Sequence, residues 1–365
     1  MKRFIFLSTC CLVSGYNHAA ANDLFLTAAP LKSSSEKFNI NASVDAVNKT
    51  IDFLNLRQSQ GPVADGAGDY IGGNIGGHYI INDQFSVEGN YWYRNIDYSQ
   101  DTNTIHSWLL ATRYTPPIDL KPSDHLVVRF STWGDFSKEL SKSTPTQVAN
   151  YKFQSVQVKN PNDVQAQIDT IFSRKFDTMN QLNGYFGIGY SKVSVDEINA
   201  QMLRNKCLFD LNIARDNQVT GNLNKPCVVN GVTVNELSFN ENASNYNLDV
   251  KKDLNYDAFY TSMGISWNWR YRDFESQIAY QYQRLWRQDI DDRISNSGTS
   301  PVKDNHSFGL KLSYDINPRL TAFLEGQVFE RNFVGTIPFL YNQVTASRLD
   351  RRYGLASLGV TFHGF

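Results

Sequence analysis

The sequence has no long apolar run and no excess of charge of one sign. Beyond the N-terminal segment, no stretch approaches the roughly 18 consecutive apolar residues that a membrane-spanning helix needs. The formal net charge is -1 over 365 residues, so the composition indicates neither nucleic acid nor an anionic surface as a partner. If the mature chain lies in a membrane, these absences leave a closed β-barrel as the spanning structure.

Cysteine is also scarce. Of the four cysteines, two lie near the N-terminus, and the others are Cys207 and Cys227, in one long polar segment. Neither has a CxxC partner and no histidine lies nearby, so the pattern indicates no zinc site. A lone pair in an exported chain predicts a disulfide bond formed in an oxidising compartment.

The N-terminal segment has the features of a secretion signal. Two basic residues precede an apolar run at 4–13, which is too short to span a bilayer, and small residues follow at 19–21. We therefore expect a signal peptide at 1–21, cut after Ala21, and a mature chain of residues 22–365. The alternative is a lipoprotein anchored through Cys10 or Cys11.

Aromatic residues are unusually frequent in a chain of low hydropathy. There are 23 Phe, 19 Tyr and 6 Trp, while the mean hydropathy is -0.41. A transmembrane barrel needs aromatic girdles at both membrane interfaces, whereas its lumen and loops stay polar. Composition alone fits a soluble, tyrosine-rich β-sandwich almost as well.

From about residue 37 to the end, apolar and polar residues alternate with a period of two, which indicates strands. Most of the candidate strands are longer than a typical globular strand and suit a tilted membrane strand. The expected strands, about twelve in number, lie near residues 38–48, 70–81, 85–98, 104–114, 125–133, 164–176, 182–193, 256–271, 274–286, 307–316, 320–329 and 353–362.

The connections between these strands alternate in length. Short links such as 82–84 and 272–273 contain the Asn and Asp of tight turns, whereas 135–163 and 194–255 are long. Short periplasmic turns alternating with long extracellular loops are typical of an outer-membrane barrel, and a sandwich has no reason to follow that rhythm. We therefore predict an all-β fold, a single transmembrane antiparallel up-and-down β-barrel of about twelve strands over residues 22–365.

The last eight residues, Leu-Gly-Val-Thr-Phe-His-Gly-Phe, alternate in polarity and end on Phe365. This tail resembles the C-terminal signal of bacterial outer-membrane β-barrel proteins. The resemblance implies a Gram-negative outer membrane, contact with its lipid and lipopolysaccharide, and recognition of Phe362 and Phe365 by the barrel-assembly machinery. Phe365 follows Phe362 by three positions, which departs from the alternation and predicts a small bulge at Gly364.

The predicted lumen face carries charges of both signs, with basic groups slightly in excess. A ring of such side chains could favour anionic solutes. The other interpretation is that these charges pair across a filled barrel that conducts nothing. The candidate lumen-lining residues are Arg94, Arg113, Arg129, Lys175, Arg270, Arg287, Lys311, Arg331, Glu88, Asp169 and Glu325.

No constellation indicates catalysis, a metal or a cofactor. His306 and Ser307 are adjacent, so in a strand they face opposite ways and cannot act as base and nucleophile on one face. We therefore expect a narrow porin-like passive channel for small polar or weakly anionic solutes. A non-conducting surface, structural or adhesive barrel with a disulfide-closed loop is the alternative, and an outer-membrane lipid-modifying enzyme is a third.

Overall fold

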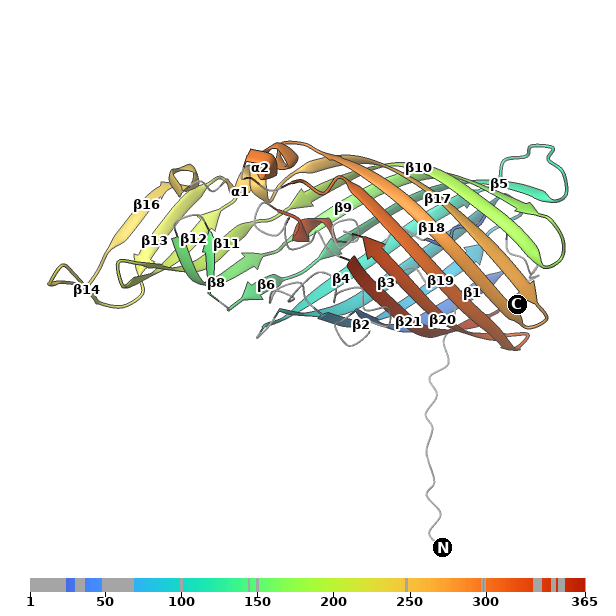
Figure 1. The fold of residues 1–365 in the computed structure, drawn as a ribbon, viewed down its shortest axis with the longest axis horizontal. Helices are drawn as coiled ribbons and strands as arrows, with labels where there is room; N and C mark the ends of the chain where they lie inside the picture. The colour runs from blue at the N-terminus through green and yellow to red at the C-terminus, as the bar shows by residue number, and fades with distance from the viewer. Residues whose placement is uncertain are drawn as a thin grey trace, which may run out of the picture.

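The fold is an antiparallel barrel closed on itself (Figure 1). The computed structural model describes residues 24–29, 37–47, 69–98, 101–143, 145–148, 151–246, 249–296, 298, 300–330, 337–342, 346 and 352–364. Within these residues, twelve strands form the barrel: β1 (Phe38–Val47), β2 (Asp69–Ile80), β3 (Phe85–Tyr98), β4 (Asp101–Tyr114), β5 (Asp124–Phe136), β9 (Asn162–Lys175), β10 (Asn180–Ser194), β17 (Asp257–Tyr271), β18 (Phe274–Arg287), β19 (Asp304–Asn317), β20 (Leu320–Glu330) and β21 (Arg352–His363).

The barrel closes where the first strand pairs with the last. In β1, Ala42 lies opposite Ile75 of β2 on one side and opposite Val360 of β21 on the other. Each of the twelve strands expected from the sequence corresponds to one barrel strand, and the ends differ by a few residues at most. The predicted fold is therefore confirmed.

The barrel turns its apolar side chains outward. In β9, Val164, Ile168 and Phe172 are 49%, 55% and 39% exposed, whereas Gln165 and Asp169 between them are 3% and 0% exposed. A soluble protein buries its apolar face, so this arrangement is inverted relative to a soluble barrel. It fits an outer surface that is solvated by lipid chains.

Aromatic groups gather near both ends of this outer face. At one end the Trp269 ring lies 6.2 Å from the Tyr271 ring and 6.1 Å from the Phe274 ring. Toward the other end His106 stacks on Phe136 with ring centroids 5.0 Å apart. These two belts are the girdles that the composition predicted.

Short turns join the strands at one end, which we call the turn end. The Asn82 side-chain oxygen accepts the backbone N–H groups of Gln84 and Phe85, each at 2.9 Å. The Asp177 carboxylate likewise accepts the N–H groups of Met179 and Asn180 at 2.7 Å. A further hydrogen bond from the Asn180 side chain is the main cause that holds the pKa of Asp177 below its usual value.

The opposite end, which we call the loop end, carries a second sheet within the long loops predicted at 135–163 and 194–255. The sequence analysis expected no strands within these loops, yet the same period-two alternation continues there, as in Cys207, Phe209 and Leu211 of one strand, which are all buried. The sheet extends from the left of the barrel in Figure 1. Its strands are β6 (Glu139–Lys142), β7 (Thr146–Val148), β8 (Tyr151–Lys159), β11 (Glu197–Arg204), β12 (Cys207–Ala214), β13 (Gln218–Leu223) and β16 (Ser238–Asn242).

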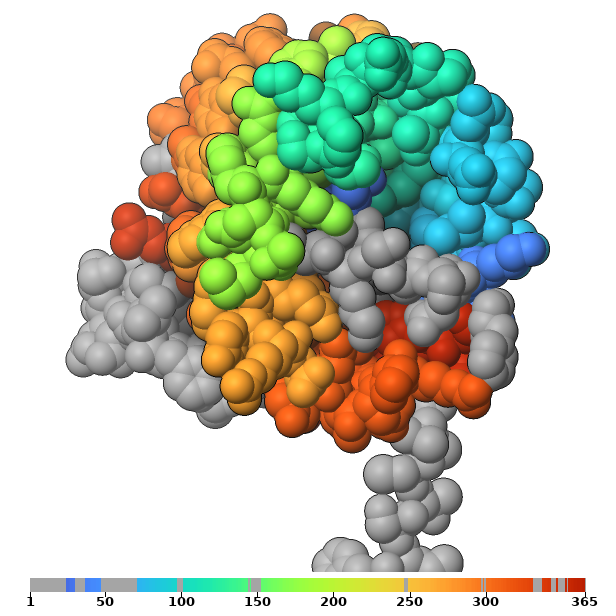
Figure 2. Space-filling model, turned by 90° about the vertical axis from the view of Figure 1, so that its right-hand side faces the viewer, coloured from blue at the N-terminus to red at the C-terminus, as the bar shows by residue number. Residues whose placement is uncertain are grey.

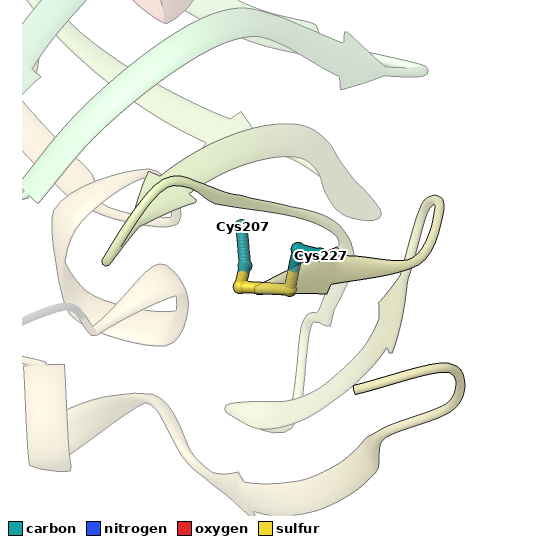
Figure 3. The surroundings of a disulfide bond; sticks show 2 residues. All are labelled: Cys207 and Cys227. Atoms are coloured by element: carbon teal, nitrogen blue, oxygen red, sulfur yellow. A yellow bond between two sulfur atoms is a disulfide. The ribbon is translucent and has the colours of Figure 1, made fainter. Parts of the chain in front are cut away.

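The predicted disulfide joins this sheet to a small hairpin. Cys207 begins β12, and Cys227 begins β14 (Cys227–Val229), which pairs with β15 (Val232–Val234) (Figure 3). The Cα atoms of the two cysteines are 5.4 Å apart. The bridge is therefore present, as predicted, and it holds the hairpin against the apolar side of the sheet.

Among the described residues, four short helices complete the loop end. They are η3 (Ala243–Tyr246), α1 (Val250–Asp253), α2 (Ile290–Asn296) and η4 (Pro338–Leu340). No helix among the described residues is long and apolar enough to cross a bilayer. Phe362 lies at the turn end with its ring centroid 6.4 Å from that of Phe38, whereas the predicted signal peptide, Arg331 and Phe365 lie outside the described residues.

Two glycines, one facing inward and one facing outward, differ in the space that a larger side chain would find. A Cβ at Gly359 would lie 2.0 Å from the Phe323 ring and 2.5 Å from the backbone oxygen of Ala42, whereas at Gly326, on the outer face, it would meet nothing within 4 Å. We expect Gly359→Val to lower the free energy of unfolding by about 1–3 kcal/mol because the backbone must move. Gly326→Val should leave it nearly unchanged. Urea titration followed by the heat-modifiable gel shift measures both, and equal effects would contradict this packing.

Candidate functional site

The candidate site is the lumen, whose wall is polar and closely packed. Ser131 and Ser262 are 0% exposed, Asn305 is 1% exposed and Gln167 is 3% exposed, although all four face inward from barrel strands. Side chains that lined a water-filled pore would remain accessible to water. The interior is therefore filled over the depth of these residues.

An ion-pair network lies at the centre of the lumen. Arg129 is fully buried, and its Nε donates to Glu88, while its Nη1 lies 3.5 Å from the Asp169 carboxylate. Glu88 also lies 3.7 Å from Nε of Arg113. One arginine thus links two carboxylates from different strands, and the charges inside the barrel compensate one another.

Other predicted lumen residues also have partners of opposite charge. Arg94 lies 3.6 Å from Asp135, and Lys311 lies 3.7 Å from Glu325. Nearer the turn end, Arg270 Nη1 lies 3.1 Å from Glu275. Burying a charge beside a partner of opposite charge destabilises the fold less than burying it alone.

Two predicted lumen residues lie at the ends of the lumen. Arg287 lies at the loop end, 3.4 Å from Asp291 of α2, with its guanidinium 4.1 Å from the centroid of the Tyr341 ring. Lys175 is half-buried at the turn end of β9. The structure thus places all the predicted lumen residues that it describes on the inner side of the barrel.

The sequence analysis missed several acidic partners. Asp135 was placed in a long loop and Asp291 in a loop between strands, so neither was counted on the lumen face. Asp315, which accepts from Arg270, was also missed. With these residues included, the predicted excess of basic groups disappears.

A segment before the first strand lies inside the barrel. Residues 24–29, which we call the lumen segment, are placed among inward-facing side chains of the turn-end half. Leu24, Phe25 and Leu26 are 2%, 5% and 3% exposed. Figure 2, which faces the turn end, shows these blue atoms within the ring of strands. No sequence pattern predicted this placement.

A second group of residues closes the loop end. Inward-facing Ile96, Ile105, Val193, Phe329 and Leu355 form an apolar ring at the top of the barrel. The helix α2 and residues 337–342 pack against this ring, and we call the two together the cap. The residues of the cap that are buried there are Ile290, Ile294, Ile337, Phe339, Leu340 and Tyr341.

No group of three or more His, Cys, Asp or Glu among the described residues is placed to hold a metal ion. His306 lies on the outer face, with Nδ1 2.8 Å from the Tyr280 hydroxyl, and Ser307 faces inward, as the alternation predicted.

Comparison with known proteins finds similar structures but no match in sequence. No protein-family model and no curated protein matches the chain. The translocator domain of autotransporter NalP from Neisseria meningitidis is similar at 9% identity and a TM-score of 0.47, covering 89% of this chain and 88% of its own. The NanC porin is similar at 10% identity and a TM-score of 0.38, covering 89% of this chain and 98% of its own. The Pseudomonas putida toluene transporter TodX is similar at 9% identity and a TM-score of 0.37, covering 91% of each chain.

The class follows from the molecule itself. A closed antiparallel ladder, an apolar outer face, two aromatic belts and a polar inside together define a transmembrane β-barrel of the bacterial outer-membrane type. Within that class, this chain is a twelve-stranded barrel with an added sheet at the loop end and a lumen filled by its own residues.

The central network predicts a large effect of one substitution. Arg129→Met would remove the fully buried cation that lies between Glu88 and Asp169, so we expect the free energy of unfolding to fall by about 3–5 kcal/mol. The matched control is Arg284→Met, because Arg284 is 45% exposed on the outer face and lies 3.2 Å from Asp304. An exposed pair contributes about 0–1 kcal/mol. Urea unfolding in lipid measures both, and similar losses would argue against a compensated central network.

Proposed function

We propose that the protein is a narrow passive channel for small polar solutes in the outer membrane, seen here in a closed form. The observation that carries this proposal is that the lumen is closed by residues that are not part of its wall. The lumen segment fills the turn-end half, and the cap covers the loop end.

The number of strands supports the proposal. A barrel of about eight strands is just narrow enough to be filled by its own side chains, and the lumen widens as strands are added. A wall of twelve strands encloses more space than that, so filling it requires additional residues. A barrel that served only as an anchor would need neither the extra strands nor the filling segments.

The wall favours small polar solutes without a strong preference for one charge. Its buried side chains are largely Ser, Asn and Gln, and its charged groups form pairs. Displacement of the lumen segment and the cap would leave a polar path with compensated charge. Such a path would not prefer anionic solutes.

The remaining assignments belong to the same proposal. We place the turn end in the periplasm and the loop end outside the cell, because short turns are periplasmic in this class. The girdle residues would contact outer-membrane lipid and lipopolysaccharide, and the last strand with Phe362 would be recognised by the barrel-assembly machinery. The proposal includes no nucleic acid, no cofactor and no catalytic step.

Planar-bilayer conductance tests the proposal. We expect few or no openings from the full chain, and discrete openings from a variant that lacks residues 24–29 and carries Leu340→Ala and Tyr341→Ala, because both closures are then weakened. Val228→Ala with Val232→Ala, on the exposed hairpin, is the control and should behave as the full chain does. Conductance at background level from the folded double-site variant would exclude the channel.

A second function is favoured by the sheet at the loop end. It projects beyond the barrel, and its hairpin exposes Val228 and Val232, which are 56% and 65% exposed. We propose that this sheet presents a binding surface outside the cell, with the Cys207–Cys227 bridge keeping it ordered. This function does not require that the barrel conducts.

Removal of the disulfide tests that role. The bridge closes a loop with a sequence separation of 20, which corresponds to about 3 kcal/mol of unfolded-state entropy. We expect Cys207→Ser with Cys227→Ser to make the sheet sensitive to protease added to intact cells. The heat-modifiable shift of the barrel should stay unchanged. Unchanged protease resistance would show that the sheet does not depend on the bridge.

A further inference from the structure

The lumen segment packs against apolar residues of the lumen wall. Leu26 packs with Val127, Ile171 and Tyr185, which are inward-facing residues of three strands. Leu24 and Phe25 lie beside Gly309 and Ala279. The part of the wall around the segment, which we call the recess, thus places apolar positions against all three of its apolar side chains.

Gly309 makes the room for two of these side chains. A Cβ there would lie 2.5 Å from Cδ2 of Leu24 and 2.8 Å from Cζ of Phe25. The Lys311 ammonium lies 5.8 Å from the centroid of the Phe25 ring, at cation–π distance. A glycine facing inward thus admits side chains that a larger residue would exclude.

The wall also contacts the backbone of the lumen segment through four side chains from four strands. Gln277 donates to the carbonyl oxygen of Phe25 at 3.2 Å, and Arg113 donates to that of Thr27 at 2.9 Å. Gln181 donates to the carbonyl oxygen of Ala29, and the Ala28 N–H donates to Ser173 Oγ at 2.8 Å. Hydrogen bonds to several peptide groups along one segment are the contacts that recognise a peptide rather than an apolar solute.

The Thr27 side chain adds a sequence-specific contact. Its Oγ1 donates to Oδ1 of Asn183 at 3.0 Å and accepts from Nε2 of Gln181 at 2.8 Å. The recess thus takes apolar side chains at the first positions and a hydroxyl at the fourth. This order of side chains is what a peptide ligand would need in order to bind there.

We propose that the turn-end half of the lumen is a peptide-binding site, and that residues 24–29 are its tethered ligand. The site recognises a short peptide with two or three consecutive apolar side chains followed by a small hydroxyl residue. Ala29 lies near the turn beside Gln181, and Leu24 lies deeper beside Gly309, so a competing peptide would enter from the turn end. The site exists whether or not the barrel conducts.

Binding in trans tests the site directly. The probe is the fluorescent peptide Leu-Phe-Leu-Thr-Ala-Ala with an amidated C-terminus, added to a folded variant that lacks residues 24–29. We expect saturable binding to this variant and, because the tether occupies the site, binding to the full chain that is weaker by about tenfold or more. In the deletion variant, Gly309→Leu should weaken binding by a similar factor, about tenfold. Gly326→Leu, on the outer face, should not.

Binding that is equal in the full chain and the deletion variant, or unaffected by Gly309→Leu, would overturn the proposal. Should the deletion variant fail to fold, the full chain with Leu26→Cys provides the second measurement. We expect Gly309→Leu to expose Cys at position 26 to a water-soluble thiol reagent, and Gly326→Leu to leave it protected. Protection in both variants would also overturn the proposal, whereas the conductance result has no bearing on it.

Discussion

The rest of the structure depends on the hydrogen bonds between β1 and β21. Lipid chains offer no partner to a backbone amide, so a sheet in a bilayer must have no open edge. The pairing of Ala42 with Val360 and of its neighbours along both strands removes that edge. Once the sheet is closed, alternate residues must face lipid and lumen, which fixes an apolar outside and a polar inside.

The polar inside creates a second constraint. Buried charges and amides must be compensated, and the wall achieves this with pairs such as Arg129 with Asp169 and Lys311 with Glu325. Twelve strands leave space that these side chains do not fill, and the chain fills it with the lumen segment and the cap. The filled lumen is therefore a consequence of barrel size together with residues from outside the wall.

The sequence predicted the barrel because a strand that faces lipid on one side and the lumen on the other must alternate, as in Val164, Gln165 and Ala166 of β9. It predicted the Cys207–Cys227 bridge because only one pairing remained. It did not predict the loop-end sheet, because short strands in a polar segment resemble loops. Nor did it predict the lumen segment, since the contacts of Thr27 with Ser173 and Asn183 join residues far apart in the chain.

The central claim is that the lumen is filled by the protein itself, and thiol accessibility tests it most directly. Ser262 is fully buried at mid-barrel, and the native cysteine pair is oxidised, so Ser262→Cys would introduce the one reactive thiol of the described residues. We predict that a small water-soluble thiol reagent does not modify this cysteine in the folded protein and modifies it fully after unfolding. Rapid modification of the folded protein would contradict a filled lumen.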